Sequence, residues 1–155
     1  MKNILLAFDD SKNAFRAVEL MSRAFSPDNK ITLLHVLPDT AVLCEMNSPE
    51  LTDYFVTQQS NFCALEEKKK ALVEEAMKTA KSTLIAAGYP EDHVTTKIEI
   101  KKRGVARDII SEAQAGYDMV VIGRRGLSGI KEFFIGSVSQ KVMHAAKDIS
   151  VLIVN

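Results

Sequence analysis

Residues 118–126 read Asp-Met-Val-Val-Ile-Gly-Arg-Arg-Gly, an apolar run that ends in a glycine-rich, basic stretch. The apolar part at 119–122 has no polar residue within it, which is typical of a strand buried on both faces of a sheet. Residues 4–8 form a similar run, Ile-Leu-Leu-Ala-Phe, followed by Asp-Asp-Ser. Two such strands favour a parallel sheet, because parallel sheets are covered by helices on both faces.

Working outward from these runs, strands and helices alternate along the chain. Apolar or alternating segments predict further strands at 31–36, 94–100 and 151–154, with the alternating one at a sheet edge. Helical periodicity predicts helices over 14–25, 62–87 and 105–113 and a short one starting at Ser137. Strand followed by helix, four times over, and then a last strand predict one α/β domain over residues 1–155.

Residues 38–60 fit this alternation least well. Ser48-Pro49 is predicted as a helix start, with serine as the N-cap and proline at the first helical position. In the separate helix predicted over 62–87, a stripe that includes Leu65 and Leu72 is expected to face the core. Gly88 is expected to cap that helix in the left-handed conformation.

Composition and charge exclude several classes of protein. The 155 residues are 46% apolar, which excludes a disordered chain, and the 20 basic and 20 acidic residues cancel. A nucleic-acid binder and a basic membrane-binding surface are therefore not expected. No apolar stretch approaches the roughly 18 residues of a membrane span. Cys44 and Cys63 are interpreted as two separate thiols, which suit the reducing cytoplasm where we expect the protein.

The glycines of residues 123–139 give the strongest functional signal. Ligands of open parallel sheets bind beyond the carboxyl ends of strands, at the point where the strand order reverses. Glycines at 123 and 126 are expected to let backbone approach a ligand, and Gly136 and Ser137 open a helix whose first N–H groups attract phosphate. Neither a P-loop nor a dinucleotide fingerprint is present. Additional hydroxyl donors and positive charges are offered by Ser139, Arg124, Arg125 and Lys131.

The spacing Gly123-x2-Gly126-x9-Gly136-Ser137 resembles the nucleotide-binding motif of the ATP-binding members of the universal stress protein family. The resemblance covers nearly the whole chain, including residues 4–11, 33–36, 104–110 and 118–154. It implies an open five-stranded parallel sheet in the order 3-2-1-4-5, Rossmann-like and similar to the adenine nucleotide alpha hydrolases.

The resemblance also implies which residues contact the nucleotide. Asp9 and Val36, with Ala7 beside them, would contact the adenine and ribose end, and Gly123, preceded by Ile122, would approach the ribose. Magnesium would accompany ATP, and the family commonly dimerises through its last strand, here Val151-Leu152-Ile153-Val154. The phosphates would be held by Arg125, Gly126, Gly136, Ser137, Val138 and Ser139. Asp10 departs from the family, where many members have glycine or an apolar residue.

Catalytic motifs are absent from the sequence. No nucleophile elbow or zinc-protease motif occurs, and His35, His93 and His144 fall on different elements and are predicted to be structural or exposed. We therefore predict an ATP-binding regulatory or stress-response protein with slow or no hydrolysis, in which ATP orders the loop between Gly123 and Gly136. Two alternatives stay open: an enzyme that hydrolyses adenine nucleotides, and a dimeric interaction protein that binds no ATP.

Overall fold

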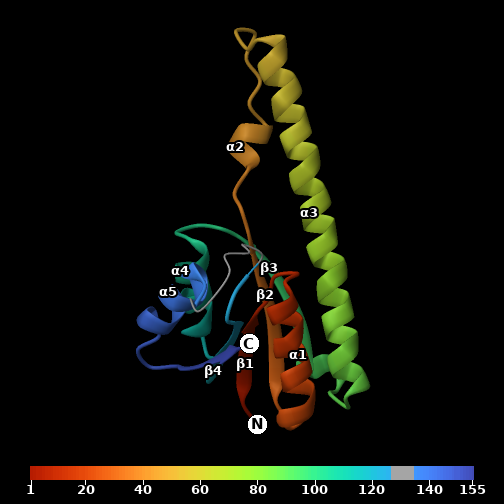
Figure 1. Ribbon diagram of the computed structural model, residues 1–155, viewed down its shortest axis with the longest axis vertical. Coiled ribbons are helices and arrows are strands. Elements are labelled where there is room, and N and C mark those ends of the chain that lie inside the picture. The colour runs from red at the N-terminus through yellow and green to blue at the C-terminus, as the bar shows by residue number, and fades with distance from the viewer. Residues whose placement is uncertain (127–134) are drawn as a thin grey trace.

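Five parallel strands form one sheet in the computed structural model, which describes residues 1–126 and 135–155 (Figure 1). The strands are β1 (Asn3–Ala7), β2 (Lys30–Leu37), β3 (Val94–Ile100), β4 (Met119–Gly123) and β5 (Ser150–Val154). Their order is β3-β2-β1-β4-β5, which confirms the predicted order. Ala7 pairs with Leu34 on one side and Ile122 on the other, so three carboxyl ends meet at the centre of the sheet.

Helices cover both faces of the sheet, as predicted. α1 (Lys12–Ala24) and α3 (Asp53–Ala86) pack on one face, and α4 (Val105–Ala113) and α5 (Ser137–Ala145) pack on the other. A 3-10 turn, η1 (Glu91–His93), precedes β3. β1 alternates between the two cores, because successive side chains of a strand point to opposite faces. Among the described residues, no helix has both the length and the apolar character needed to cross a bilayer.

Single residues define the start of α1 and the end of α3, and at the latter the predicted left-handed cap is confirmed. Ser11 is buried and caps α1, since its hydroxyl accepts a hydrogen bond from the N–H of Ala14 at 3.2 Å. Gly88 follows α3 with a φ of 99°, the left-handed conformation that glycine adopts without strain.

α3 begins nine residues before the helix predicted over 62–87, and the predicted helix start at Ser48-Pro49 is wrong. Thr52 is the N-cap, and its hydroxyl accepts from the N–H of Phe55 at 3.3 Å. Ser48 instead opens a turn, in which its carbonyl accepts from the N–H of Leu51 at 3.1 Å. α3 therefore runs for 34 residues, and only its second half packs on the sheet. Leu65 and Leu72 lie in or next to the half that extends past the sheet and are 51% and 56% exposed, so their predicted place in the core is also wrong.

The remainder of α3 forms a projecting arm with the chain that precedes it. We call residues 38–72 the arm; it contains α2 (Ala41–Cys44) and the first part of α3, and it extends well beyond the sheet (Figure 1). Cys44 and Cys63 form a disulfide within it, so the interpretation as two separate thiols is wrong. The two cysteines are 19 positions apart in sequence and meet only because the chain doubles back along α3.

Candidate functional site

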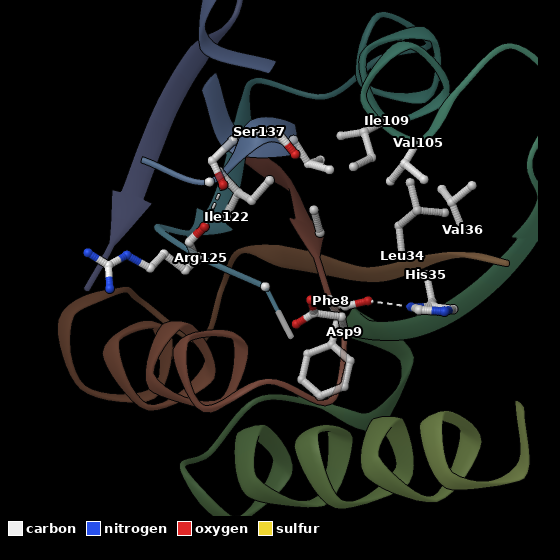
Figure 2. Close-up of a pocket in the computed structure, with 16 residues that line it drawn as sticks. Phe8, Asp9, Leu34, His35, Val36, Val105, Ile109, Ile122, Arg125 and Ser137 are labelled. Atoms are coloured by element: carbon white, nitrogen blue, oxygen red, sulfur yellow. Dashed lines mark hydrogen bonds between the residues drawn. The ribbon is translucent and has the colours of Figure 1, made fainter. Parts of the chain in front are cut away.

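A cavity of about 210 Å³ lies beyond the carboxyl ends of β1, β2 and β4 (Figure 2). This is the place where the strand order reverses, and where an open parallel sheet binds ligands. All the site residues predicted from the sequence line it: Ala7, Asp9, Val36, Ile122, Gly123, Arg125, Gly126, Gly136, Ser137, Val138 and Ser139. The structure thus brings these residues together, and their roles as ligand contacts stay predictions.

One end of the cavity is apolar. Leu34 and Val36 of β2 face Val105 and Ile109 of α4 there, and Figure 2 shows the four side chains grouped together. The sequence pattern did not single out Leu34, Val105 or Ile109, because apolar residues at strand and helix spacing are read as core. The spacing of Val105 and Ile109, one helical turn apart, is nevertheless a signal in the sequence. It indicates an apolar helix face that runs from the core to the edge of the sheet.

His35 also lines the cavity and was predicted to be only structural or exposed. Its Nδ1 lies 2.7 Å from the carbonyl oxygen of Phe8 (Figure 2). A carbonyl can only accept, so Nδ1 carries the hydrogen, and in the neutral ring Nε2 is then an acceptor. The bond ties the end of β1 to β2 and fixes the orientation of the ring at the cavity wall.

Asp9 lines the cavity between the end of β1 and the glycine-rich segment. Its Oδ1 accepts a hydrogen bond from the N–H of Ser11 at 3.1 Å. Its Oδ2 would lie only 2.6 Å from a Cβ added to Gly126. The carboxylate therefore lies directly against the glycine, which leaves no room for a side chain unless Asp9 moves. Asp10, by contrast, is not among the residues that line the cavity.

Two of the motif glycines, Gly123 and Gly136, have protein backbone packed against them. A Cβ on Gly123 would lie 2.8 Å from the Cβ and 3.0 Å from the carbonyl carbon of Asn13, so it faces the first turn of α1. A Cβ on Gly136 would lie 3.2 Å from the carbonyl oxygen of Arg124, which already accepts from the N–H of Gly136 at 2.8 Å. We expected a glycine at 123 because a ligand approaches its backbone. The structure shows a different reason, since α1 packs too closely there to leave room for a side chain.

The N-terminus of α5 faces the same cavity. Its N-cap is Gly136, which has no side chain to cap the helix, and its first turn contains no acidic residue. The hydroxyl of Ser139 is buried and donates to the carbonyl of Gly123 at 2.8 Å, so it has no second hydrogen to offer a ligand. The backbone N–H groups of the first turn are therefore the donors that this helix presents to an anion.

One of the positive charges predicted for the phosphate end, Arg125, is at the cavity, and its role in holding phosphate stays a prediction. Arg125 lines the cavity, but Figure 2 shows its side chain extending away from the apolar residues around Val36 and Ile109. The carbonyl of Arg125 accepts from Nδ2 of Asn13 at 3.3 Å, which joins this segment to α1. Lys131 lies outside the described residues.

α4 is held at the cavity by a buried carboxylate. Asp108 accepts hydrogen bonds from the N–H groups of Lys102 and Arg103 at 2.8 Å and 3.2 Å. Burial raises the pKa of Asp108, but hydrogen bonds from the backbone N–H groups of residues 102–104 outweigh it, and the net pKa is lowered. Gly104 precedes the helix with a φ of 132°, which a residue with a side chain would adopt only with strain. The turn fixes where Val105 enters the cavity wall.

The described part of the chain contains no group of three or more His, Cys, Asp or Glu side chains arranged to hold a metal ion. Asp9 is the carboxylate among the cavity-lining residues. A Mg²⁺ ion at this site would therefore need most of its ligands from a bound phosphate chain and water, which is its usual mode of binding to nucleotides in proteins.

Comparisons with known proteins agree with the fold. A model of the universal stress protein family matches residues 1–155. The chain is 31% identical over 145 residues, 92% of its length, to a universal stress protein of Mycolicibacterium smegmatis, and it spans 45% of that relative. Among solved structures, UspA from Lactobacillus plantarum is similar with a TM-score of 0.71 at 22% identity, covering 99% of this chain and 97% of that one. A universal stress protein in complex with cAMP has a TM-score of 0.62 at 18% identity, covering 99% and 96%.

Proposed function

The chain belongs to the universal stress protein family, and from that premise we propose that it binds ATP with magnesium as a regulatory, stress-response protein that hydrolyses the nucleotide slowly or not at all. One observation carries the proposal. A single cavity combines an apolar end with a phosphate-type end made of glycine backbone and an uncapped helix N-terminus. A nucleotide has the matching asymmetry, with a flat, largely apolar base at one end and charged phosphates at the other.

The base would lie between β2 and α4. Val36 and Leu34 would contact one side and Val105 and Ile109 the other. His35 Nε2 is an acceptor in the neutral ring and would suit a donor such as the amino group of adenine or a ribose hydroxyl. The related protein in complex with cAMP supports an adenine nucleotide as the ligand class.

The phosphates would lie at the N-terminus of α5, beside residues 124–126. The helix dipole contributes only about 0.3–1 kcal/mol for a favourably placed charge. A micromolar ligand needs about 8 kcal/mol in total. Several backbone N–H groups, the hydroxyl of Ser137 and burial of the base must therefore act together, with Asp9 placed to meet a magnesium ion held by the phosphates.

Slow turnover is part of the proposal because, among the described residues that line the cavity, Asp9 is the one carboxylate that could activate water at the terminal phosphate, and the family resemblance places it nearer the base. One observation favours the enzymatic alternative. Asp9 Oδ2 lies against Gly126, at the start of the phosphate-type end, rather than only beside the base. Release of inorganic phosphate from Mg-ATP, measured for the parent and for Asp9→Asn, separates the two: turnover that the substitution abolishes would establish hydrolysis as the function.

We further propose that the protein is a cytoplasmic homodimer. β5 ends the sheet and pairs with β4 alone among the described strands, and its free edge offers N–H and C=O groups to the β5 of a second copy. The cytoplasm is the compartment that supplies ATP. Sedimentation equilibrium should give the mass of two chains, and cell fractionation should recover the protein with cytoplasmic markers.

Calorimetric titration tests the ligand directly. Mg-ATP, ADP, AMP and cAMP are titrated into the parent protein, into Gly126→Val and into Ser82→Ala, an exposed position on α3 that serves as the matched control. Saturable binding of Mg-ATP to the parent and to Ser82→Ala, lost in Gly126→Val, is the expected result. Absence of binding by all four nucleotides in the parent would refute the proposal and favour the interaction protein that binds no ATP. The proposed ordering of the loop falls mainly on residues outside the described part, and protease protection by ATP tests it.

A further inference from the structure

The arm contains the disulfide between Cys44 and Cys63, at a place far from the core of the domain. Cys44 is the last residue of α2 and Cys63 lies in the projecting half of α3, and both residues are partly exposed (Figure 1). We propose that these cysteines form a reversible thiol–disulfide exchange site, which reacts with small-molecule disulfides and dithiol reductants and decides whether residues 38–52 stay bound along α3. The reversibility rests on the proposed cytoplasmic location, where disulfides are usually transient.

Few other contacts hold residues 38–52 against the helix. α2 has four residues and none of them is buried. Thr52 is bonded to the first turn of α3 as its N-cap. The other hydrogen bonds in the described chain between this segment and α3 come from Nε2 of Gln59, which donates to the carbonyls of Leu43 at 2.5 Å and Met46 at 2.8 Å. A helix of one turn is not stable alone, because isolated helices shorter than about 12 residues are marginal in water. The disulfide is therefore the main restraint on the segment.

The segment covers a specific face of α3. Phe55, Gln59, Cys63 and Glu66 recur at helical spacing and are less exposed than their neighbours in the arm. This row continues, along the helix, the face that packs on the sheet further on through buried residues such as Val73. Residues 38–52 thus occupy, over the arm, the place that the sheet occupies over the rest of α3.

Release of the segment would add to the apolar side chains that the arm already exposes. Tyr54 is 76% exposed, Phe62 38% and Leu65 51% in the disulfide form. Phe55 is partly exposed and lies on the same row of α3 as Gln59 and Cys63, so it is expected to join them once the segment leaves that row. Reduction is therefore expected to increase the apolar area that the arm exposes to solvent.

The exchange step balances as a two-electron reaction. A thiolate of the pair attacks one sulfur of an external disulfide, and one external thiol leaves as a mixed disulfide forms. The second cysteine then attacks the mixed disulfide, the Cys44–Cys63 bond forms, and the second external thiol leaves. The pair loses two electrons and two protons, and the external disulfide gains both. A dithiol reductant reverses each step.

Thiol counting tests whether the pair is reversible. The protein is equilibrated with mixtures of reduced and oxidised glutathione, alkylated, and weighed by mass spectrometry. The expected result is one cooperative transition between zero and two free thiols, recovered in both directions. Two thiols that stay reduced in oxidised glutathione, or a disulfide that dithiothreitol cannot open without denaturant, would overturn the proposal.

Hydrogen exchange tests what the bond holds. On reduction, amides of residues 40–66 should exchange about tenfold faster or more, while those of the sheet stay unchanged. The Cys44→Ser/Cys63→Ser variant should exchange like the reduced protein with or without reductant, and Ser60→Ala, an exposed serine of the same helix, should respond like the parent. Identical exchange in the oxidised and reduced parent would overturn the inference. Neither readout uses a nucleotide, so failure of ATP binding and failure of this switch are separate results.

Discussion

Gly123 and Gly126 belong to the same motif, but changing each to alanine should have different effects. We expect Gly123→Ala to lower stability and Gly126→Ala to lower nucleotide affinity. At Gly123 the added Cβ would lie 2.8 Å from Asn13 Cβ, 3.0 Å from its carbonyl carbon and 3.2 Å from the backbone nitrogen of Ala14. Carbon atoms in contact normally lie about 3.5–4.0 Å apart. The obstacle is the backbone of α1, which cannot rotate away as a side chain can, so the helix must shift.

The magnitude follows from the kind of obstacle. Overpacking a well-packed site typically costs about 1–3 kcal/mol, and we expect that loss in the free energy of unfolding of Gly123→Ala. For a domain of this size it corresponds to a fall in Tm of about 2–4 °C per kcal/mol. At Gly126 the nearest atom is Asp9 Oδ2 at 2.6 Å, the end of a rotatable side chain. Gly126→Ala should therefore change stability by less than about 0.5 kcal/mol.

In the binding assay, Gly126→Ala is expected to have the larger effect of the two variants. Because Gly126→Ala displaces the Asp9 carboxylate, we expect Mg-ATP affinity to fall by a factor of about 3–10, the worth of one hydrogen bond. Urea unfolding followed by circular dichroism measures stability, and calorimetry measures the affinity of the folded protein. If Gly126→Ala lost as much stability as Gly123→Ala, or if Gly123→Ala unfolded like the parent, the assignment of the two glycines would be refuted.

Three further substitutions test hydrogen bonds elsewhere. Asp108→Asn should lower the free energy of unfolding by about 1.5–3 kcal/mol at pH 7. Because the pKa of Asp108 is lowered in the folded protein, the carboxylate stabilises the fold above its unfolded pKa of about 3.9, and this contribution is lost as the pH falls. Urea unfolding at about pH 3 should therefore show a smaller difference between variant and parent than at pH 7, and an equal difference at both pH values would contradict this. Tyr89→Phe removes a buried hydroxyl that donates to the carbonyl of Met21 at 3.1 Å and should lower the free energy of unfolding by about 0.5–1.5 kcal/mol, whereas unchanged unfolding would show that the bond contributes nothing. Ser11→Ala should cost about 1 kcal/mol through loss of the α1 cap, and Ser11→Thr, which keeps the hydroxyl, should recover most of it in thermal unfolding.

The sheet could be predicted because its signals are local in sequence. Uninterrupted apolar runs at 4–8 and 119–122 identify central strands, since only a strand covered on both faces needs no polar side. The strand order and the place of the cavity then followed from family resemblance and from the rule for open parallel sheets. The spacing of Gly126 and Gly136 was informative even though the physical cause given for Gly123 was different.

The arm could not be predicted, because its structure depends on how far a neighbouring element reaches. Periodicity in residues 62–87 shows which face of the helix is apolar, but not where the sheet ends beneath it. Leu65 and Leu72 therefore looked like core and are exposed. Likewise, Cys44 and Cys63 pair only because residues 38–52 run back along α3, and nothing in their separation of 19 positions requires that.

The end of β2 joins the arm to the cavity along the chain. We nevertheless expect that movement of the arm does not reach the cavity. Val36 lines the cavity, and residues 38–52 begin just beyond Leu37. The carbonyl of Leu37 accepts from the N–H of Lys101 at 2.7 Å, so β2 stays bonded to the chain after β3 up to its last residue. Movement of the arm must break this bond before it can displace Val36. We therefore expect Mg-ATP to bind the oxidised and reduced proteins with affinities within about twofold; a tenfold difference, about 1.4 kcal/mol of coupling, would show that the bond does not separate the two sites.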